Sequence, residues 1–96
     1  MILQIVKFHS TLSLDEVKEI AQERAAEFES VPGLIQKYYF RSMQEEGEYG
    51  GVYIWDSPKS MQAYRDSELA ASIPQAYKIN SQPKIEIHEV AFMLRD

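Results

Sequence analysis

The alternation of strand-like and helix-like segments is the feature that most limits the folds open to this chain. Four segments are rich in branched and aromatic side chains, as β-strands are: residues 2–9, 34–43, 50–55 and 84–94. Between the first two, apolar residues recur at three- and four-residue steps, which indicates an amphipathic helix. A second helix is expected between the third and fourth strands. This order predicts a ferredoxin-like βαββαβ α+β fold, a four-stranded antiparallel sheet with both helices on one face.

Capping signals mark where these helices begin and end. Ser13-Leu14-Asp15-Glu16 is a capping box, in which the Ser13 hydroxyl and the Glu16 carboxylate each bind the other residue's backbone N–H. Val31-Pro32-Gly33 is expected to end this helix. Asp56 or Ser57 is expected to cap the second helix, with Pro58 in its first turn. Residues 68–77 are expected to be further helix, broken near Pro74.

Two helices cover one face of such a sheet, and strand residues alternate between faces. We assign an apolar set to the helix-packed core: Val6, Phe8, Tyr38, Phe40, Val52, Ile54, Ile85 and Ile87. We assign a mixed set to the other face: Lys7, His9, Lys37, Tyr39, Arg41, Tyr53, Trp55, Glu86 and His88. A strand bulge would reverse such an assignment.

The second face is also expected to carry many apolar side chains: Leu3, Ile5, Ile35, Met43, Val90, Phe92 and Leu94. An apolar area of this extent usually marks an interface. We therefore expect a homodimer whose two sheets pack face to face across a two-fold axis, with a cavity for a small, flat molecule between them. Residues 1–96 are expected to form one domain. A domain this short buries only about 60–65% of its unfolded surface, so pairing would add stability.

Charge and composition exclude several functional classes. Ten basic and fifteen acidic residues give a net charge of −5, which disfavours nucleic acid and anionic membranes as partners. An RNA-binding ferredoxin-like domain needs aromatic side chains amid positive charge, so this reading is disfavoured. Cysteine is absent, which excludes disulfides and thiolate metal sites. The apolar start is too short to span a bilayer, and we expect a cytoplasmic protein.

Four motifs carry a resemblance that covers nearly the whole chain. They are Pro32-Gly33-Leu34, Lys37-Tyr38-Tyr39, Gly50-Gly51-Val52-Tyr53-Ile54-Trp55 and Ser57-Pro58-Lys59-Ser60-Met61-Gln62-Ala63-Tyr64. These motifs resemble the YdhR-like family of monooxygenase-like proteins, within the antibiotic-biosynthesis-monooxygenase or dimeric α/β-barrel superfamily. The resemblance implies a paired ferredoxin-like barrel. It is tightest between residues 32 and 65.

The resemblance also implies a reaction. In the better-understood members, oxygen is added to an aromatic substrate without metal or flavin, and the substrate carbanion reduces O₂. No cofactor and no metal are therefore expected. Trp55 falls where those members carry a barrel-facing tryptophan, whereas Gly51 stands where they carry an asparagine. A glycine has no side chain with which to donate a hydrogen bond to an oxyanion.

Candidate catalytic residues are His9, Trp55 and His88, since a histidine in a dry cavity could act as a general base. Each has a plainer reading, as a core or interface aromatic for Trp55 and as partly exposed strand residues for the histidines. Candidate substrate-binding residues are Lys37, Tyr39, Arg41, Tyr53 and Tyr64. The two basic residues would hold an anionic group, or else would protect a sheet edge against aggregation. The tyrosines would donate hydrogen bonds or would simply pack.

Two functions follow as alternatives. The first is a cofactor-independent monooxygenase-like enzyme acting on a small aromatic or enolisable substrate. The second is a non-catalytic small-molecule-binding or stress-related protein that uses the same cavity, which Gly51 favours.

Overall fold

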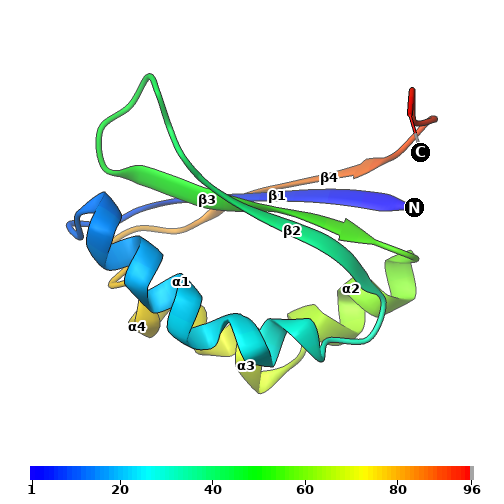
Figure 1. The fold of residues 1–96 in the computed structure, drawn as a ribbon, viewed down its shortest axis with the longest axis horizontal. Coiled ribbons are helices and arrows are strands. Elements are labelled where there is room, and N and C mark those ends of the chain that lie inside the picture. Colours follow the sequence, from blue (N-terminus) through cyan, green and yellow to red (C-terminus); the bar gives the residue numbers. More distant parts are fainter. Residues whose placement is uncertain (96) are drawn as a thin grey trace.

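The computed structural model describes residues 1–95. Among these residues the elements follow in this order: β1 (Ile2–His9), α1 (Leu14–Glu29), β2 (Leu34–Arg41), β3 (Glu48–Trp55), α2 (Pro58–Arg65), α3 (Glu68–Ala71), α4 (Ile73–Ala76) and β4 (Lys84–Glu89). Figure 1 shows the sheet as one layer and the helices as a second layer beneath it. Within the described residues, no helix combines the length and the apolar character needed to cross a membrane.

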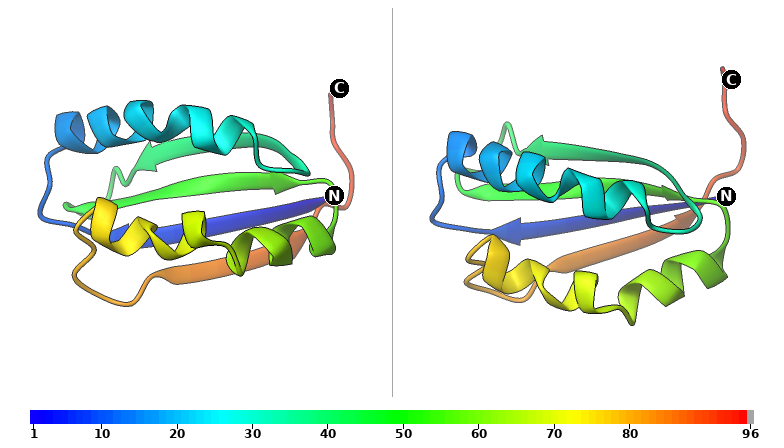
Figure 2. Two further views of the ribbon diagram at one scale, coloured as in Figure 1. Left: turned by 90° about the horizontal axis from the view of Figure 1, so that it is seen from below. Right: turned by 60° about the horizontal axis from the view of Figure 1, so that its bottom comes forward.

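The strands form one antiparallel sheet in the order β2-β3-β1-β4. This is the strand order of a ferredoxin-like fold, so the predicted fold class is confirmed. In Figure 2, α1 lies over the β2 side of the sheet and α2, α3 and α4 lie over the β4 side. The helices α1, α2, α3 and α4 cover the same face. We call this the helix face and the other the open face.

The predicted capping signals operate as expected. The Ser13 hydroxyl accepts a hydrogen bond from the Glu16 N–H at 3.2 Å, and the Glu16 carboxylate accepts one from the Ser13 N–H at 3.0 Å. Ser57, rather than Asp56, caps α2 by accepting the Ser60 N–H at 3.2 Å. The helical stretch predicted for residues 68–77 is divided into α3 and α4 at Ser72.

Strand ends were predicted less well than strand centres. The last strand stops at Glu89, so residues 90–94 do not extend it as expected. β3 begins at Glu48, two residues earlier than predicted, and β2 ends at Arg41 instead of residue 43. Apolar content extended the last prediction because Phe92 and Leu94 resemble strand residues, yet both are more than four-fifths exposed.

Two apolar clusters hold the sheet to the helices. The first contains Ile2, Phe28, Tyr53, Trp55, Met61 and Tyr64. The second contains Phe8, Val17, Tyr49 and Tyr77. Trp55 is completely buried and lies 5.3 Å from Tyr64 between ring centroids. The clusters therefore consist largely of aromatic rings.

The face assignment predicted for β2 and β3 is wrong. In the observed register Val6 lies opposite Gly51, so the odd-numbered residues of β3 share the helix face with the even-numbered residues of β1. Four residues assigned to the core therefore lie on the open face: Tyr38, Phe40, Val52 and Ile54. Five residues assigned to the other face lie on the helix face: Lys37, Tyr39, Arg41, Tyr53 and Trp55. A register shift between Leu34 and Gln36 places the odd-numbered residues Lys37, Tyr39 and Arg41 of β2 on the helix face.

The face assignments predicted for the residues of β1 and for the paired residues of β4 agree with the register. Val6 and Ile85 are paired and lie on the helix face, as does Ile87 opposite Gln4. Lys7, Glu86 and His88 lie on the open face together with Leu3 and Ile5. His9 lies on the open face opposite Glu48.

Gly50 is required where β1 and β3 approach each other. A Cβ atom at this position would overlap the Val6 carbonyl oxygen and would lie 2.5 Å from Phe40 Cζ. We expect Gly50→Ala to lower the free energy of unfolding by about 1–3 kcal/mol, because a strand must move to admit the methyl group. Gly51→Ala is the matched control, since its nearest neighbour would be Tyr53 Cε1 at 3.2 Å. Urea denaturation of both variants measures the difference, and equal losses would contradict this account.

Candidate functional site

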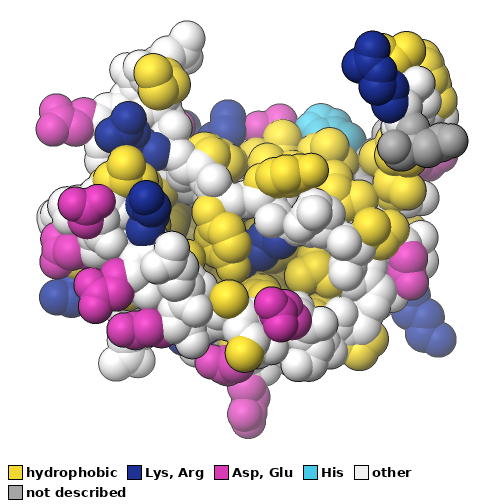
Figure 3. Space-filling model, viewed as in Figure 1, with side chains coloured by type: hydrophobic (Ala, Val, Ile, Leu, Met, Phe, Trp, Pro, Cys, Tyr) yellow, Lys and Arg dark blue, Asp and Glu magenta, His cyan; other side chains and the backbone are white. Residues whose placement is uncertain are grey.

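A cavity of about 330 Å³ lies between the sheet and the helices. It is lined by members of both apolar clusters, which places it between them. Its sheet wall comes from all four strands and includes Gln4, Lys37, Gly51 and Ile85. Figure 3 shows a hollow between sheet and helices in which hydrophobic side chains surround a basic one. A mainly apolar cavity with a few polar groups is the usual form of a small-molecule site.

Lys37 extends along this cavity among aromatic rings. Its Nζ atom lies 3.5 Å from the ring centroid of Phe28, 4.4 Å from that of Tyr39 and 4.6 Å from that of Tyr53. Cation–π attraction to several rings holds an ammonium group in place without a carboxylate. Within residues 1–95, Lys37 Nζ forms no ion pair and no hydrogen bond. The amine is thus available to a bound molecule.

Burial changes the protonation of this amine. Desolvation and, to a smaller extent, the positive charge of Arg24 together lower the pKa of Lys37 from its usual 10.5 to about 7. Neutral and charged forms therefore coexist near neutral pH. The neutral form can accept a proton, and the charged form attracts an anion.

Arg24, on α1, adds a second positive charge. Its Nη2 donates a hydrogen bond to the Ser72 hydroxyl at 2.5 Å. Its Nε is buried and has no hydrogen-bond acceptor among residues 1–95. No carboxylate within this range pairs with it. Arg24 and Lys37 together give this part of an acidic protein a local positive potential.

Three tyrosines bring phenolic hydroxyls to the cavity. The Tyr53 and Tyr64 hydroxyls lie 3.4 Å apart, and burial raises the pKa of both groups. Burial also raises the pKa of Tyr77 to about 12, and its hydroxyl has no partner among the described residues. All three hydroxyls therefore stay protonated at neutral pH and can donate hydrogen bonds to a ligand oxygen.

Trp55 lies behind the cavity wall. Its ring stacks on Tyr53 at a centroid distance of 6.0 Å and an interplanar angle of 4°. Its Nε1 donates a hydrogen bond of 2.9 Å to Gln4 Oε1, in a pair that is fully buried. Both neighbours line the cavity, whereas Trp55 does not. Trp55 thus orients two cavity residues from behind.

The predicted site residues fall into two groups. Lys37, Tyr39, Tyr53 and Tyr64 all line the cavity, and Trp55 supports it. His9 and His88 lie on the open face, where the first contacts Glu45 and the second contacts Glu86. Arg41 is exposed at the end of β2 and is not a cavity residue. The cavity that these residues line lies within one subunit, and the pocket expected between paired sheets stays a prediction.

Sequence reasoning missed Gln4 and Tyr77 as cavity residues and Arg24 as a positive charge that acts on Lys37. Arg24 stands out in the sequence as the one charged residue in the apolar stripe of α1. Gln4 stands out because it interrupts an apolar strand, and the structure shows that it is 2% exposed. A polar residue on a face that is otherwise buried indicates either a hydrogen-bond partner or a cavity.

The pKa of Lys37 predicts how stability depends on pH. Between pH 7 and 10.5, folded Lys37 is neutral while the unfolded chain is still protonated there. The unfolded state then binds more protons, so stability rises with pH in this window; below pH 7 Lys37 contributes no slope. We expect the Tm of the protein to rise relative to that of Lys37→Met between pH 7 and pH 9.5. Thermal denaturation of both proteins checks this, and a constant difference in Tm would contradict it.

Comparison with known proteins gives one family and a set of similar folds. Residues 2–89 match the family described as "Putative mono-oxygenase ydhR". Among curated proteins, none matches the chain.

The similar structures include the cofactor-independent oxygenase SnoaB of Streptomyces nogalater, in a variant with one asparagine replaced by alanine. It has a TM-score of 0.77 and 14% identity, covering 99% of this chain and 97% of that one. A "putative antibiotic biosynthesis monooxygenase" of Caulobacter crescentus has a TM-score of 0.74 and 18% identity, covering 95% and 91%. A protein of the same description from Deinococcus radiodurans has a TM-score of 0.74 and 12% identity, covering 100% and 98%. At these identities the likeness shows the fold.

Proposed function

Because the chain belongs to the family described as "Putative mono-oxygenase ydhR", as its motifs predicted, we propose that it is a cofactor-independent oxygenase. Its substrate would be a small aromatic or enolisable molecule held in the cavity between sheet and helices. The observation that carries the proposal is the Lys37 amine, which lies among aromatic rings without an acidic partner in residues 1–95. The cofactor-independent oxygenase of similar fold supports the reaction class.

The first step is ionisation of the substrate. Neutral Lys37 accepts the proton of a phenol or an activated C–H group, which leaves a substrate anion beside an ammonium group. Arg24 adds positive charge, and the Tyr53, Tyr64 and Tyr77 hydroxyls donate hydrogen bonds to the developing oxyanion. The side chains of Tyr39 and Tyr53, which line the cavity, provide flat surfaces for an aromatic ring.

The second step transfers electrons from the substrate anion to O₂. A C–O bond forms, the resulting hydroperoxide loses water, and a C–H₂ group becomes a carbonyl. The balance is R₂CH₂ + O₂ → R₂C=O + H₂O, with the substrate as sole reductant. The apolar walls of the cavity exclude water from the carbanion, which would otherwise be protonated again.

Oxygen uptake with a panel of hydroxylated aromatic and enolisable compounds tests the proposal. We expect consumption of one O₂ per molecule of product, with one ¹⁸O atom incorporated from ¹⁸O₂. The histidine roles stay predictions, and His9→Asn and His88→Asn test them in the same assay. No uptake with any compound that binds in the cavity would refute the oxygenase proposal.

Gly51 favours a second candidate, a non-catalytic small-molecule-binding or stress-related protein. This residue lies in the cavity wall, and a Cβ there would lie 3.4 Å from Lys37 Cε. The wall therefore offers no side-chain donor at this point. Ligands that raise Tm without oxygen uptake or product formation would establish this alternative.

We also propose that the protein is a homodimer joined through the open face. The row Ile5, Val52 and Tyr38 crosses this face, and Tyr38 is 59% exposed. Residues 90–95 rise on the same side in Figure 1, and they expose Phe92 and Leu94. A second copy would bury these side chains and would present the same surface in return. The cytoplasmic location expected from the sequence stays a prediction.

Sedimentation velocity at micromolar concentration checks the dimer. We expect a mass of two chains for the protein, and mainly one chain for Tyr38→Asp, because burying the new carboxylate in the interface is unfavourable. Gln75→Asp places the same charge on exposed α4 and should remain dimeric. A stable monomer of the unmodified protein would contradict the proposal.

A further inference from the structure

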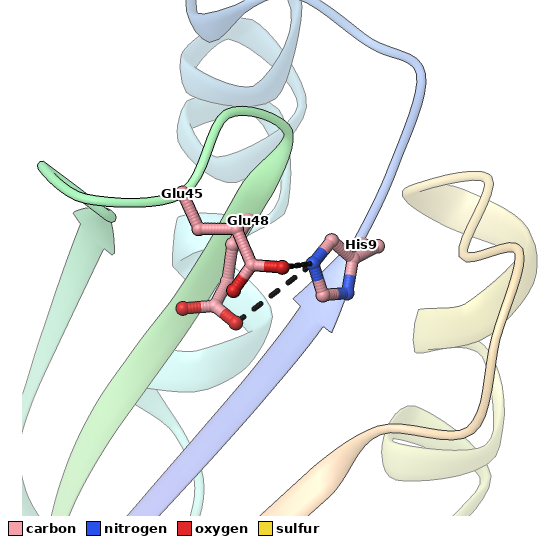
Figure 4. Close-up of side chains that lie close together, drawn as sticks. All are labelled: His9, Glu45 and Glu48. Carbon is pink, nitrogen blue, oxygen red and sulfur yellow. Dashed lines mark hydrogen bonds and ion pairs between the residues drawn. The ribbon is translucent and has the colours of Figure 1, made fainter.

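Three side chains that commonly bind metals converge on the open face, on the opposite side of the sheet from the cavity. His9 ends β1, Glu45 lies in the loop between β2 and β3, and Glu48 begins β3. His9 Nε2 lies 2.9 Å from Glu45 Oε1 and 3.9 Å from Glu48 Oε2. One ligand atom from each residue lies within 4.8 Å of the others. Figure 4 shows both carboxylates turned toward the same imidazole nitrogen.

The backbone positions these residues. His9 and Glu48 are directly paired in the sheet, so their side chains project on the same side. The Ser10 N–H donates to the Gly47 carbonyl at 3.0 Å and joins the loop to the end of β1. The Ser42 hydroxyl accepts the Glu45 N–H at 3.0 Å, which orders the start of the loop. The three ligand atoms are therefore brought together by fixed structure on two strands and the turn between them.

The position of the Glu48 carboxylate favours a bound ligand. The residue is 8% exposed and its side chain 11% exposed, and its carboxylate faces His9 Nε2. His9 at 3.9 Å is too distant for a hydrogen bond to it. No lysine or arginine among residues 1–95 forms an ion pair with Glu45 or Glu48. Two carboxylates held beside one imidazole form a site that a bound cation would stabilise.

We propose that His9, Glu45 and Glu48 bind a divalent transition-metal ion, with Zn²⁺ as the preferred ion. One imidazole nitrogen and two carboxylate oxygens are ligands that Zn²⁺ accepts, while Mg²⁺ prefers oxygen ligands only. Bond lengths of about 2.1 Å place tetrahedral ligand atoms about 3.4 Å apart, between the two separations observed at His9. Water would take the fourth position. The ion would join β1 to the β2–β3 loop and would act independently of the cavity.

Calorimetric titration of the untagged protein with ZnCl₂ tests the site. We expect one Zn²⁺ per chain, a rise in Tm of about 5 °C or more at saturation, and no comparable effect of MgCl₂. Glu48→Gln should weaken Zn²⁺ binding by at least about tenfold, since a ligand is lost while the shape is kept. His88→Asn is the matched control, because within residues 1–95 His88 contacts one carboxylate, that of Glu86 at 3.3 Å. This variant should bind Zn²⁺ as the unmodified protein does.

Proton NMR of the unmodified protein gives a measurement that depends on no variant. Equimolar Zn²⁺ should shift the ring resonances of His9 and leave those of His88 in place. The proposal is overturned if equimolar Zn²⁺ shifts neither ring or both equally, or if folded Glu48→Gln binds Zn²⁺ as tightly as the unmodified protein.

Discussion

Replacing Lys37 with methionine is expected to lower the rate of oxygen uptake about 100- to 1000-fold. This is the range lost when a preorganised group that stabilises a developing oxyanion is removed. Methionine keeps the length of the side chain but can neither accept the substrate proton nor balance the negative charge that follows. Among residues 1–95 no acidic group holds the Lys37 amine, so no other partner competes with the substrate for it.

The same variant separates function from folding. Below pH 7, Lys37→Met is expected to be at least as stable as the unmodified protein, because it no longer holds a charged amine in a desolvated position. Lys18→Met is the control, since Lys18 is exposed on α1 and should retain full activity. Steady-state oxygen uptake and thermal denaturation are measured on all three proteins. Full activity in folded Lys37→Met would remove Lys37 from the mechanism.

Replacing Trp55 with alanine is expected to lower the free energy of unfolding by about 3–5 kcal/mol. Trp55 is completely buried, stacks on Tyr53 and bonds to Gln4, so its removal leaves a large void and an unpaired amide. A domain of this size has a total stability of about 5–15 kcal/mol, and the variant should be unfolded or close to it at 37 °C.

Trp55→Phe separates the contribution of packing from that of the hydrogen bond to Gln4. Phenylalanine fills most of the space but leaves buried Gln4 Oε1 without its donor, which is expected to lower stability by about 1–3 kcal/mol. Urea denaturation of both variants measures the loss in the free energy of unfolding. Equal losses in the two variants would assign the effect to the hydrogen bond alone, and a negligible loss in Trp55→Ala would contradict the packing described for this cluster.

Local signals were sufficient to predict the order of the elements. The capping box at Ser13 and the Ser57-Pro58 start of α2 rest on contacts within four residues, which sequence displays directly. The ferredoxin-like fold followed from that order because few arrangements satisfy it. The motifs between residues 32 and 65 likewise identified the family.

Which residues of β2 and β3 face the helices depends on how these strands pair with the rest of the sheet, and local sequence does not show this pairing. Tyr38, Phe40, Val52 and Ile54 are as apolar as a core strand pair, and no short-range pattern shows that Val6 faces Gly51. The true helix face contains Lys37, which looks unsuitable for a core unless a cavity is present to receive its amine. Four of the predicted substrate-binding residues therefore lie at one site, although they were assigned to the wrong side of the sheet: Lys37, Tyr39, Tyr53 and Tyr64. Trp55, a predicted catalytic residue, lies behind them.

The proposed function requires the cavity to hold an aromatic anion beside Lys37. Calorimetric titration with 1-hydroxy-2-naphthoate, a flat phenol that carries a carboxylate, tests this claim without requiring turnover. We expect one ligand per chain at pH 6. Because Lys37 loses its charge near pH 7, binding should weaken at least about tenfold by pH 9, and Lys37→Met should bind weakly at both values. Equal affinity at pH 6 and pH 9, undiminished in Lys37→Met, would contradict the account.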